Sequence, residues 1–551
     1  IDATTRFKIA KVQMNAGMLA MNVSAFASAF NYFERAIGYL SQDQLSQDRD
    51  LRIRLFSAAS FTAACIANFA KLQSYSSKII NDDGAPVAVK VQMHGLLSEM
   101  LIGRNEMSKG RYHIHQGLHH SGVKVPKHRA GAALSLFQIL RKLRKNPTHY
   151  LDGLRNARIN HESLEAYTMK ILEDLGTVGY LDGSHEFYVV ANCAILSLSM
   201  KVGRTPYTCI GLANLGVILT SFLGDAKAGM LYVNESLELL KQFNNKAAEC
   251  RTLFWNSLTT IWTNPYSTAV QMTLKGYKSG VKGGDITMSM ANVGMLLLLS
   301  LLSSQSLDRL LNDATKYLEQ VIEAKQVLDE WFIKAMYQAA VNLREGPNMS
   351  LLTGRIMEED DLFQAAGLGE APIANAYGAK VWLAAFFGDF EAGVKVALNA
   401  TELWKGLRGT PAEFANEYVA GVCLYGQARK TRSKKLYAAA KKCHGRMKKW
   451  VLAGNPNGTG YLALLDAEKA AFEGKNEIAV SRYAAAIVAN GRLGYSHDQA
   501  LSNVRFAEFS LERGDASEAK YRLGLASELY NEWGASFLAN RTREYMLKLG
   551  S

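Results

Sequence analysis

The chain has 551 residues and a formal net charge of +13, with 48% hydrophobic and 21% charged residues. This composition is typical of a folded, soluble protein. The 9 prolines permit long uninterrupted helices, because a proline in a helix interior costs about 3 kcal/mol. The six cysteines include no CxxC pair, which argues against a disulfide framework or a zinc site and indicates a reducing, cytoplasmic compartment.

Helical hydrophobic periodicity runs from the first residues onward. Gly17, Ala29, Phe33 and Ala36 have the spacing of small and aromatic residues found in tetratricopeptide hairpins. Small residues let two helices approach closely, and the aromatic ring fills the space that they leave. We expect further hairpins near residues 51–80, 86–120, 206–241, 246–280, 285–326 and 411–450.

The ends and the apolar runs of the chain bear on membrane insertion. The chain starts Ile1-Asp2-Ala3 with no signal peptide and no initiator methionine, so we expect it to begin inside a longer polypeptide. The most apolar run, Met288 to Leu302, contains Ser289, Asn292 and Ser300. Since a spanning helix needs about 20 apolar residues, we interpret this run as the buried helix of a hairpin and the chain as not transmembrane.

Residues 346–372 interrupt the helical pattern. They open with the turn-forming Gly346-Pro347-Asn348, continue with the acidic run Glu358-Glu359-Asp360-Asp361 and end at Pro372. We predict a connector between an N-terminal stack, residues 1–345, and a C-terminal stack, residues 373–551. The acidic run lacks the third Asp of a metal–diphosphate site, with Gln364 in its place, and is interpreted as a solvated loop.

Two stretches near the C-terminus align with each other at an offset of 40. The residues Ala467, Gly474, Ala479, Tyr483 and Ala486 recur as Ala507, Gly514, Ala519, Leu523 and Ala526. A fixed period of small residues and one large apolar residue marks a helix-hairpin repeat. Such a unit buries its apolar face only against its neighbours, so repeats stack into a solenoid.

The turns between paired helices repeat as well, as Gly224-Asp225, Gly388-Asp389 and Gly514-Asp515. Glycine suits the left-handed position that ends one helix, and aspartate caps the start of the next. Asp515 and Glu518 also have the spacing of a capping box.

Several stretches of the C-terminal third carry a family resemblance. They are Phe387-Gly388-Asp389-Phe390-Glu391-Ala392, Trp450 before Pro456-Asn457, Leu465-Asp466-Ala467-Glu468 and, most sharply, Tyr530-Asn531-Glu532-Trp533-Gly534-Ala535. In the N-terminal part, Asn15-Ala16-Gly17 with Ala29 and Phe33, and Leu101-Ile102-Gly103-Arg104, add to it. Together they resemble the tetratricopeptide-like repeat region of large signalling proteins that carry a predicted AAA-type (STAND-like) ATPase upstream, often with GAF and histidine-kinase or cyclase modules.

This resemblance implies a regulatory repeat segment that binds protein, most readily other domains of the same polypeptide, and that uses no cofactor. The chain contains no ATPase or kinase core of its own. Neither Gly454–Gly460 nor Gly280–Gly284 has the lysine and spacing of a phosphate-binding loop.

Two basic runs are the strongest surface signal. The first holds ten cations and no acid between residues 429 and 449. Its candidate acidic-partner residues are Arg429, Lys430, Arg432, Lys434, Lys435, Lys441, Lys442, Lys448 and Lys449, and Arg446 lies among them. The second run holds Lys124, Lys127, Arg129, Arg141, Lys142, Arg144 and Lys145. Such runs attract acidic proteins, anionic lipid or nucleic acid, but each also suits a solvated helix face. Nucleic acid is disfavoured because no stacking platform accompanies the charge.

A histidine group and the tryptophans complete the candidates. The group comprises His113, His115, His119, His120 and His128. His115 and His119 share a helix face, but zinc would need a third ligand and a carboxylate placed better than Glu106. We therefore interpret the group as part of a polar outer helix. Six tryptophans at helical spacings are interpreted as packing residues, namely Trp255, Trp262, Trp331, Trp382, Trp404 and Trp533.

Taken together, these patterns predict an all-α, right-handed solenoid of tetratricopeptide-like hairpins whose concave surface binds protein. The function predicted is a non-catalytic interaction and regulatory scaffold of a multidomain signalling ATPase or kinase. One alternative is an electrostatic adaptor that binds acidic partners, membrane or nucleic acid through its basic helices. The other is an enzyme built on an α/α toroid, for which the sequence offers no convergent set of acids.

Overall fold

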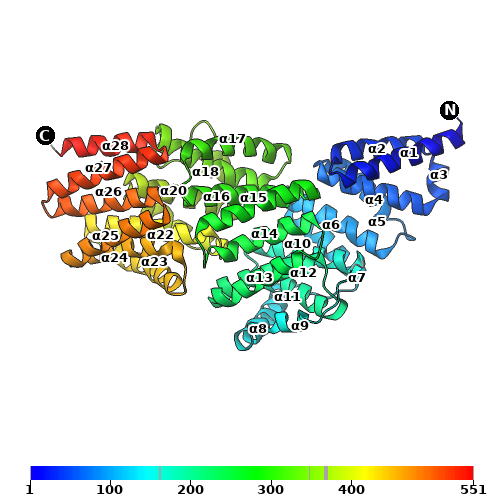
Figure 1. Ribbon diagram of the computed structural model, residues 1–551, viewed down its shortest axis with the longest axis horizontal. Helices are drawn as coiled ribbons and strands as arrows, with labels where there is room; N and C mark the ends of the chain where they lie inside the picture. Colours follow the sequence, from blue (N-terminus) through cyan, green and yellow to red (C-terminus); the bar gives the residue numbers. More distant parts are fainter. Residues whose placement is uncertain (1, 161–162, 347, 365–369, 550–551) are drawn as a thin grey trace.

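The computed structural model describes residues 2–160, 163–346, 348–364 and 370–549. Over these ranges the protein is built of α-helices and contains no β-strand. Figure 1 shows consecutive antiparallel helices stacked side by side into an elongated solenoid, with the two termini at opposite ends. The predicted all-α solenoid of helix hairpins is confirmed.

The N-terminal helices form an arm that projects from the rest of the molecule (Figure 1). The arm has its own core of apolar side chains, which runs from Ala10 to Met100. Its helices are α1 (Ala3–Asn22), α2 (Phe26–Tyr39), α3 (Gln42–Gln47), α4 (Arg49–Cys65) and α5 (Phe69–Ile80).

The central part continues the stack after the arm. Its helices are α6 (Val87–Gly103), α7 (Met107–Ser121), α8 (Arg129–Lys145), α9 (His149–Leu154), α10 (Ser163–Leu181), α11 (His185–Val202), α12 (Pro206–Ile218), α13 (Ala226–Leu240), α14 (Lys246–Thr260), α15 (Tyr266–Gly283), α16 (Ile286–Leu302), α17 (Leu307–Glu323) and α18 (Val327–Glu345). The six hairpins expected from the sequence all correspond to observed helix pairs, in the arm, here and in the C-terminal part.

The C-terminal part completes the solenoid. Its helices are α19 (Glu359–Gln364), α20 (Glu370–Phe387), α21 (Phe390–Ala400), α22 (Pro411–Thr431), α23 (Lys434–Leu452), α24 (Thr459–Phe472), α25 (Asn476–Leu493), α26 (Ser496–Glu512), α27 (Ala516–Trp533) and α28 (Ser536–Lys548). The two repeats detected in the sequence are the hairpins α24–α25 and α26–α27. Their matched residues Ala479 and Tyr483, like Ala519 and Leu523, are fully buried.

The small residues of the hairpins act as the sequence predicts. Gly17 faces the ring of Phe33, and a Cβ atom added at Gly17 would lie only 2.6 Å from that ring. Phe33, Ala29 and Ala36 are completely buried. Close approach of α1 and α2 therefore depends on the missing side chain at Gly17.

The Gly-Asp turns also have the predicted form. Gly224, Gly388 and Gly514 adopt φ values between 71° and 79°, which glycine tolerates without strain. The following aspartates accept backbone hydrogen bonds from the third residue of the next helix. The capping box at Asp515 is only half formed, because the Glu518 carboxylate pairs with Arg522 instead.

The stretch at 346–372 is more structured than a loop. Within it α19 forms, and Leu352, Met357 and Leu362 are buried in the main core. That core runs without a break from Leu143 to Ala539, past both ends of the stretch. The division into stacks 1–345 and 373–551 stays a prediction, since a shared core joins the two. In the acidic run, Glu358, Asp360 and Asp361 are exposed as expected, whereas Glu359 pairs with Lys380; Pro347 and residues 365–369 lie outside the described residues.

The solenoid coils back on itself, so that segments about two hundred residues apart in the sequence touch. Tyr180 donates a hydrogen bond to the carbonyl of Arg408, and Trp533 donates one to Gln305. At the arm, Ser24 donates to the carbonyl of Lys282 with an O···O distance of 2.6 Å. Successive turns of the superhelix are therefore in direct contact.

One described stretch, Pro206–Leu223, has the length and mean hydropathy (1.4) of a membrane-spanning helix. Within the protein, however, 72% of this window is buried, because α12 packs between α10, α11 and α14. The run Met288–Leu302 forms the buried helix α16, as predicted.

Candidate functional site

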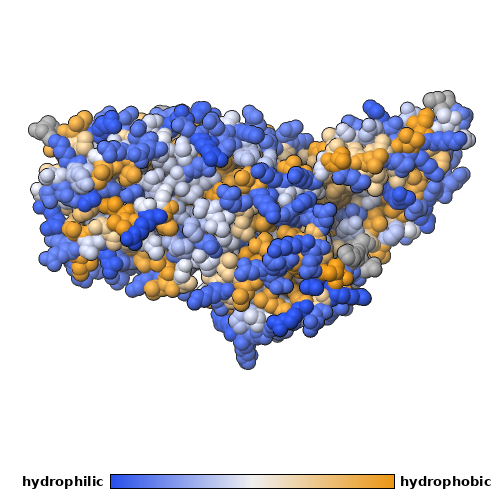
Figure 2. Space-filling model, viewed as in Figure 1, coloured by the Kyte–Doolittle hydropathy of each residue, from blue (hydrophilic) through white to orange (hydrophobic). Residues whose placement is uncertain are grey.

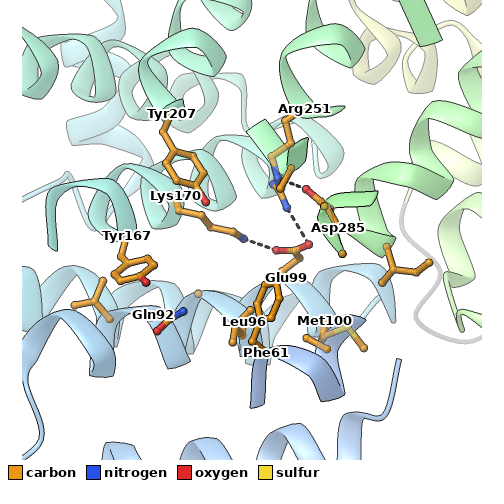
Figure 3. Close-up of a pocket in the computed structure, with 17 residues that line it drawn as sticks. Phe61, Gln92, Leu96, Glu99, Met100, Tyr167, Lys170, Tyr207, Arg251 and Asp285 are labelled. Carbon is orange, nitrogen blue, oxygen red and sulfur yellow. Dashed lines mark hydrogen bonds and ion pairs between the residues drawn. The ribbon is translucent and has the colours of Figure 1, made fainter. Parts of the chain in front are cut away.

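The helices on the inner side of the first superhelical turn converge on a cavity. We call α4, α6, α10, α12, α14 and α16 the inner helices, because each contributes lining residues or, for α16, its N-cap. The cavity has a volume of about 110 Å³. Figure 3 shows Glu99, Lys170, Arg251 and Asp285 directed toward one another at its wall.

These four side chains belong to a continuous ion network. The Arg251 guanidinium donates from Nη2 to Glu99 at 2.9 Å and from Nε to Asp285 at 2.6 Å. Lys170 Nζ lies 2.8 Å from the other Glu99 oxygen. A single carboxylate on α6 thus links cations on α10 and α14.

Deeper inside, Glu173 and Asp174 extend the network. Glu173 accepts a 2.5 Å hydrogen bond from Arg251, and Asp174 accepts a 2.6 Å bond from Lys170. Ser98 donates to the second Asp174 oxygen. The network therefore places four carboxylates around two cations, and its side chains are nearly excluded from solvent.

Burial shifts the acid–base equilibria of the network. Burial raises the pKa of Asp285 to about 7, although Arg251 partly opposes the shift. Burial likewise raises the pKa of Asp174 to about 6, against the opposing effect of Lys170. For Glu99, burial alone would raise the pKa, but Arg251 and Lys170 together lower it to about 2. Glu99 therefore stays ionised, and a proton taken up by the network resides on Asp285 or Asp174.

Aromatic and amide side chains form the remaining wall. Phe61, Gln92, Tyr167 and Tyr207 line the cavity, and Figure 3 shows the Tyr207 hydroxyl directed toward Lys170. Gln92 accepts a hydrogen bond from Ser57. Such a combination of rings, amide and ions suits a small polar ligand.

The sequence analysis did not find this network. Its members come from four helical segments, α6, α10, α14 and the start of α16, and are up to 186 residues apart in sequence, from Glu99 to Asp285. One signal was present: Glu99 and Arg251 each interrupt an otherwise buried helix face. Buried charges on inner helices are uncommon unless they are paired.

The first basic run lies on α22 and α23, and one of its members needs correction. Arg429 is buried, with 5% of its surface exposed, and pairs with Glu468 at 2.8 Å. It therefore belongs to the interior and does not contribute to an exposed binding face. Arg446 is engaged too, by Glu417 at 2.6 Å. The other eight predicted residues are exposed, namely Lys430, Arg432, Lys434, Lys435, Lys441, Lys442, Lys448 and Lys449.

Six of these lysines are regularly spaced along α23. They form three adjacent pairs, each seven residues after the last: Lys434 with Lys435, Lys441 with Lys442, and Lys448 with Lys449. Seven residues are nearly two helical turns, so the pairs lie on one face, about 10 Å apart along the axis. We call these six residues the lysine face. Ala438 and Gly445, which lie between the pairs, and Leu452, which follows the last pair, are exposed.

The second basic run is exposed along the loop before α8 and along α8 itself. In the described part of the chain, Arg129 is the one cation of this run with an ionic partner, Glu186 at 2.5 Å. Its cations are not arranged in heptad pairs.

The histidines of α7 were predicted to lie on a polar outer helix, but several of them are partly buried. His113 lies 3.0 Å from His94 of α6, Nδ1 to Nδ1, and His120 stacks on the same His94 ring. His94 is buried, and burial followed by the neighbouring His113 lowers its pKa to about 3. His115 and His119 line a separate surface hollow. The described residues contain no group of three ligands that could hold a metal ion.

The glycine-rich loop Gly454–Gly460 has a structural role. Asn457 is fully buried there and donates from Nδ2 to the carbonyls of Ile261 and Asn264 at 2.7 and 2.9 Å. Its Oδ1 accepts from the backbone N–H of Tyr266 at 3.1 Å. The loop is thus hydrogen-bonded to the connection between α14 and α15, which belongs to the preceding turn of the superhelix.

The tryptophans are mostly packing residues, as predicted. Five of the six are buried, and Trp331 is half-buried beside Lys334.

Comparisons with known proteins add little to this geometry. No family model and no curated protein sequence matches the chain. Among solved structures, the crystal structure of yeast Tom70 aligns with 98% of this chain and 96% of its own, at 11% identity and a TM-score of 0.28. This likeness is too low to argue from, so the fold assignment rests on the helix packing described above.

Proposed function

We propose that the chain is a non-catalytic protein-interaction and regulatory scaffold of a multidomain signalling ATPase or kinase, working in the cytoplasm. The observation that carries the proposal is the lysine face of α23, which presents six exposed cations in a repeating pattern on a rigid helix. The hairpin repeats supply the platform, since stacked repeats offer long continuous surfaces to partners. The multidomain context rests on the family resemblance of the sequence alone.

We place the binding surface on the outside of the solenoid, on the lysine face, because the cavities on the inside are small. A helix with its side chains is about 10 Å across, whereas the inner helices enclose only about 110 Å³. A second cavity, which lies between α16, α18, α20 and α22, has a volume of about 40 Å³. These two cavities are therefore too small to hold a partner helix, and the expectation of a protein bound elsewhere on the concave surface stays a prediction.

The lysine face suits an acidic protein segment. The small residues Ala438 and Gly445 between the lysine pairs leave room for a partner backbone to approach. Paired cations at regular intervals complement carboxylates that recur on a partner helix. The competing candidate is an electrostatic adaptor that binds anionic membrane or nucleic acid through the same residues.

A pull-down with charge-reversed variants tests the proposal. The variant Lys435→Glu, Lys442→Glu and Lys449→Glu changes one lysine of each pair on the lysine face. Within the described residues, these three side chains form no ion pair or hydrogen bond. The matched control, Lys124→Glu, Lys127→Glu and Arg141→Glu, makes the same change of charge in the second basic run. We expect the wild type and the control to retain the same identified proteins at low and moderate salt, and the α23 variant to lose them.

Two results would count against the proposal. Retention only at low salt, or of nucleic acid and vesicles alone, would favour the electrostatic adaptor, because phosphate binding weakens steeply with salt. Equal retention by all three proteins would show that the lysine face is only a solvated surface.

A further inference from the structure

The proposed scaffold function uses the outer surface and leaves the inner cavity without a role. We infer that this cavity binds a small organic cation carrying an ammonium or guanidinium group. The inference rests on the charge of the network, on the chemistry of the wall, and on the size and position of the cavity.

Charge is the first argument. Within the described part of the chain, the four carboxylates of Glu99, Glu173, Asp174 and Asp285 form ion pairs with two cations, Lys170 and Arg251, and Glu173 and Asp174 are 1% and 2% exposed. An excess of buried carboxylates is unfavourable unless protons or a cation neutralise it. A cation in the cavity would supply this charge in place of a proton.

The wall is the second argument. Phe61, Tyr167 and Tyr207 border the cavity together with Glu99 and Asp285 (Figure 3). Aromatic faces attract ammonium and guanidinium groups. Within the described part of the chain, the Tyr167 and Tyr207 hydroxyls make no hydrogen bond, so both are available to a ligand. Lys170 and Arg251 border the same space, but Glu99 and Asp285 already pair with them, so a ligand anion would have to compete with two carboxylates, which disfavours it.

Size and position are the third argument. A water needs about 10–15 Å³ by the same measure, so 110 Å³ admits a molecule of about ten non-hydrogen atoms. The cavity lies between Phe61 of α4 and Ile286 of α16. A ligand there would contact both the N-terminal arm and the helices that close the first turn, and would stabilise their association.

Calorimetric titration of the whole chain with agmatine, putrescine and choline, and with malonate as the anion, tests the inference. At pH 7.5 we expect at least one of the three cations to bind and malonate not to bind. Failure of all three cations, or binding of malonate in their place, would overturn it. The lysine-face variant described above should bind like the wild type, which separates this inference from the scaffold proposal.

The pH dependence provides a second readout on the wild type. The groups that interact with Asp285 from the packed helices are Cys65 of α4, Glu99 of α6, Tyr207 of α12, and Cys250 and Arg251 of α14. Lys170, Glu173 and Asp174 of α10 join the same network through Glu99 and Arg251. Because the cation would replace a proton held at the pKa of about 7 of Asp285, binding should weaken up to about tenfold per pH unit below 7. Binding that is independent of pH between 7.5 and 5.5 would contradict a role for this network.

A matched pair of cap variants locates the site. Asp285→Asn removes one charge from the cavity. The asparagine side-chain oxygen can still cap α16, because it can accept the hydrogen bond that the Met288 N–H donates to Asp285. Asp225→Asn makes the same change at the cap of α13, outside the cavity. We expect Asp285→Asn to weaken cation binding at least tenfold and Asp225→Asn to leave it unchanged. Equal affinity of the two variants would overturn the assignment, and thermal melting shows whether both are folded.

Discussion

Glu468 is a single residue whose buried charge is balanced by two arginines. Its carboxylate has no solvent exposure and accepts 2.8 Å hydrogen bonds from Arg429 and Arg505. Removal of one member of a buried ionic group leaves the others unpaired, which costs about 3–5 kcal/mol. We therefore expect Glu468→Gln to lower the free energy of unfolding by about 3 kcal/mol, measured by urea denaturation. The exposed Glu528→Gln should change it little.

Acidification provides an independent check on the same residue. Burial opposes ionisation of Glu468, but Arg505 and Arg429 lower its pKa to about 2. A lowered carboxylate pKa stabilises the folded state above the unfolded pKa, and this contribution is lost as pH falls through the folded pKa. The difference in stability between wild type and Glu468→Gln should therefore shrink as pH falls from about 4.5 toward 2. A difference that stays constant over this range would mean that packing, not charge, accounts for the loss.

At the scale of helices, the hairpins were predictable because their signals are local. Gly17, Phe33 and the Gly-Asp turns lie within one hairpin, and their spacing reports directly on helix pairing. Arg429 shows the limit of this approach. It sits in a basic run, and only the distant Glu468 and Tyr483, which both bond to it, reveal that it faces inward. The cavity network was missed because its partners are also distant in sequence. They meet only after α6, α10, α14 and the start of α16 have packed together.

Glycine substitutions test the packing rule of the hairpin. In Gly17→Ala the new Cβ would meet the buried Phe33 ring at 2.6 Å, and overpacking of this kind costs about 1–3 kcal/mol. Gly38→Ala is the control in the same hairpin, because nothing lies within 4 Å of its added Cβ. Since alanine favours helix over glycine by up to about 1 kcal/mol, Gly38→Ala should be neutral or stabilising. Similar unfolding free energies for the two variants would refute the close-approach explanation.

At the scale of the whole molecule, contacts between successive turns make the solenoid compact. Ser24, Tyr180 and Trp533 each bond to a carbonyl more than two hundred residues away. Repeat arrays are usually held by contacts between neighbours only, so these long-range bonds limit changes in curvature. They also explain why a closed interior could not be predicted from the sequence: no local pattern encodes which turns will meet.

Asn457 offers the sharpest test of this closure. Its side chain makes 2.7 and 2.9 Å bonds to the carbonyls of Ile261 and Asn264 and accepts from Tyr266 and Tyr495. Asn457→Ala leaves these buried groups unpaired, at a cost of about 1–3 kcal/mol for each group that water cannot reach. We expect faster amide hydrogen exchange at residues 261–266 and 493–497, with helices remote from this contact unchanged.

The control for that experiment is Asn531→Ala, an exposed asparagine on α27, which should leave exchange at both segments as in the wild type. Solution scattering distinguishes local from global loosening. If the Asn457 hydrogen bonds hold successive turns of the superhelix together, the radius of gyration of Asn457→Ala should rise. Without these bonds, the solenoid can extend without unfolding its hairpins. An unchanged radius with faster exchange would confine the effect to the two loops, and unchanged exchange would show that the remaining bonds between turns suffice to keep the superhelix closed.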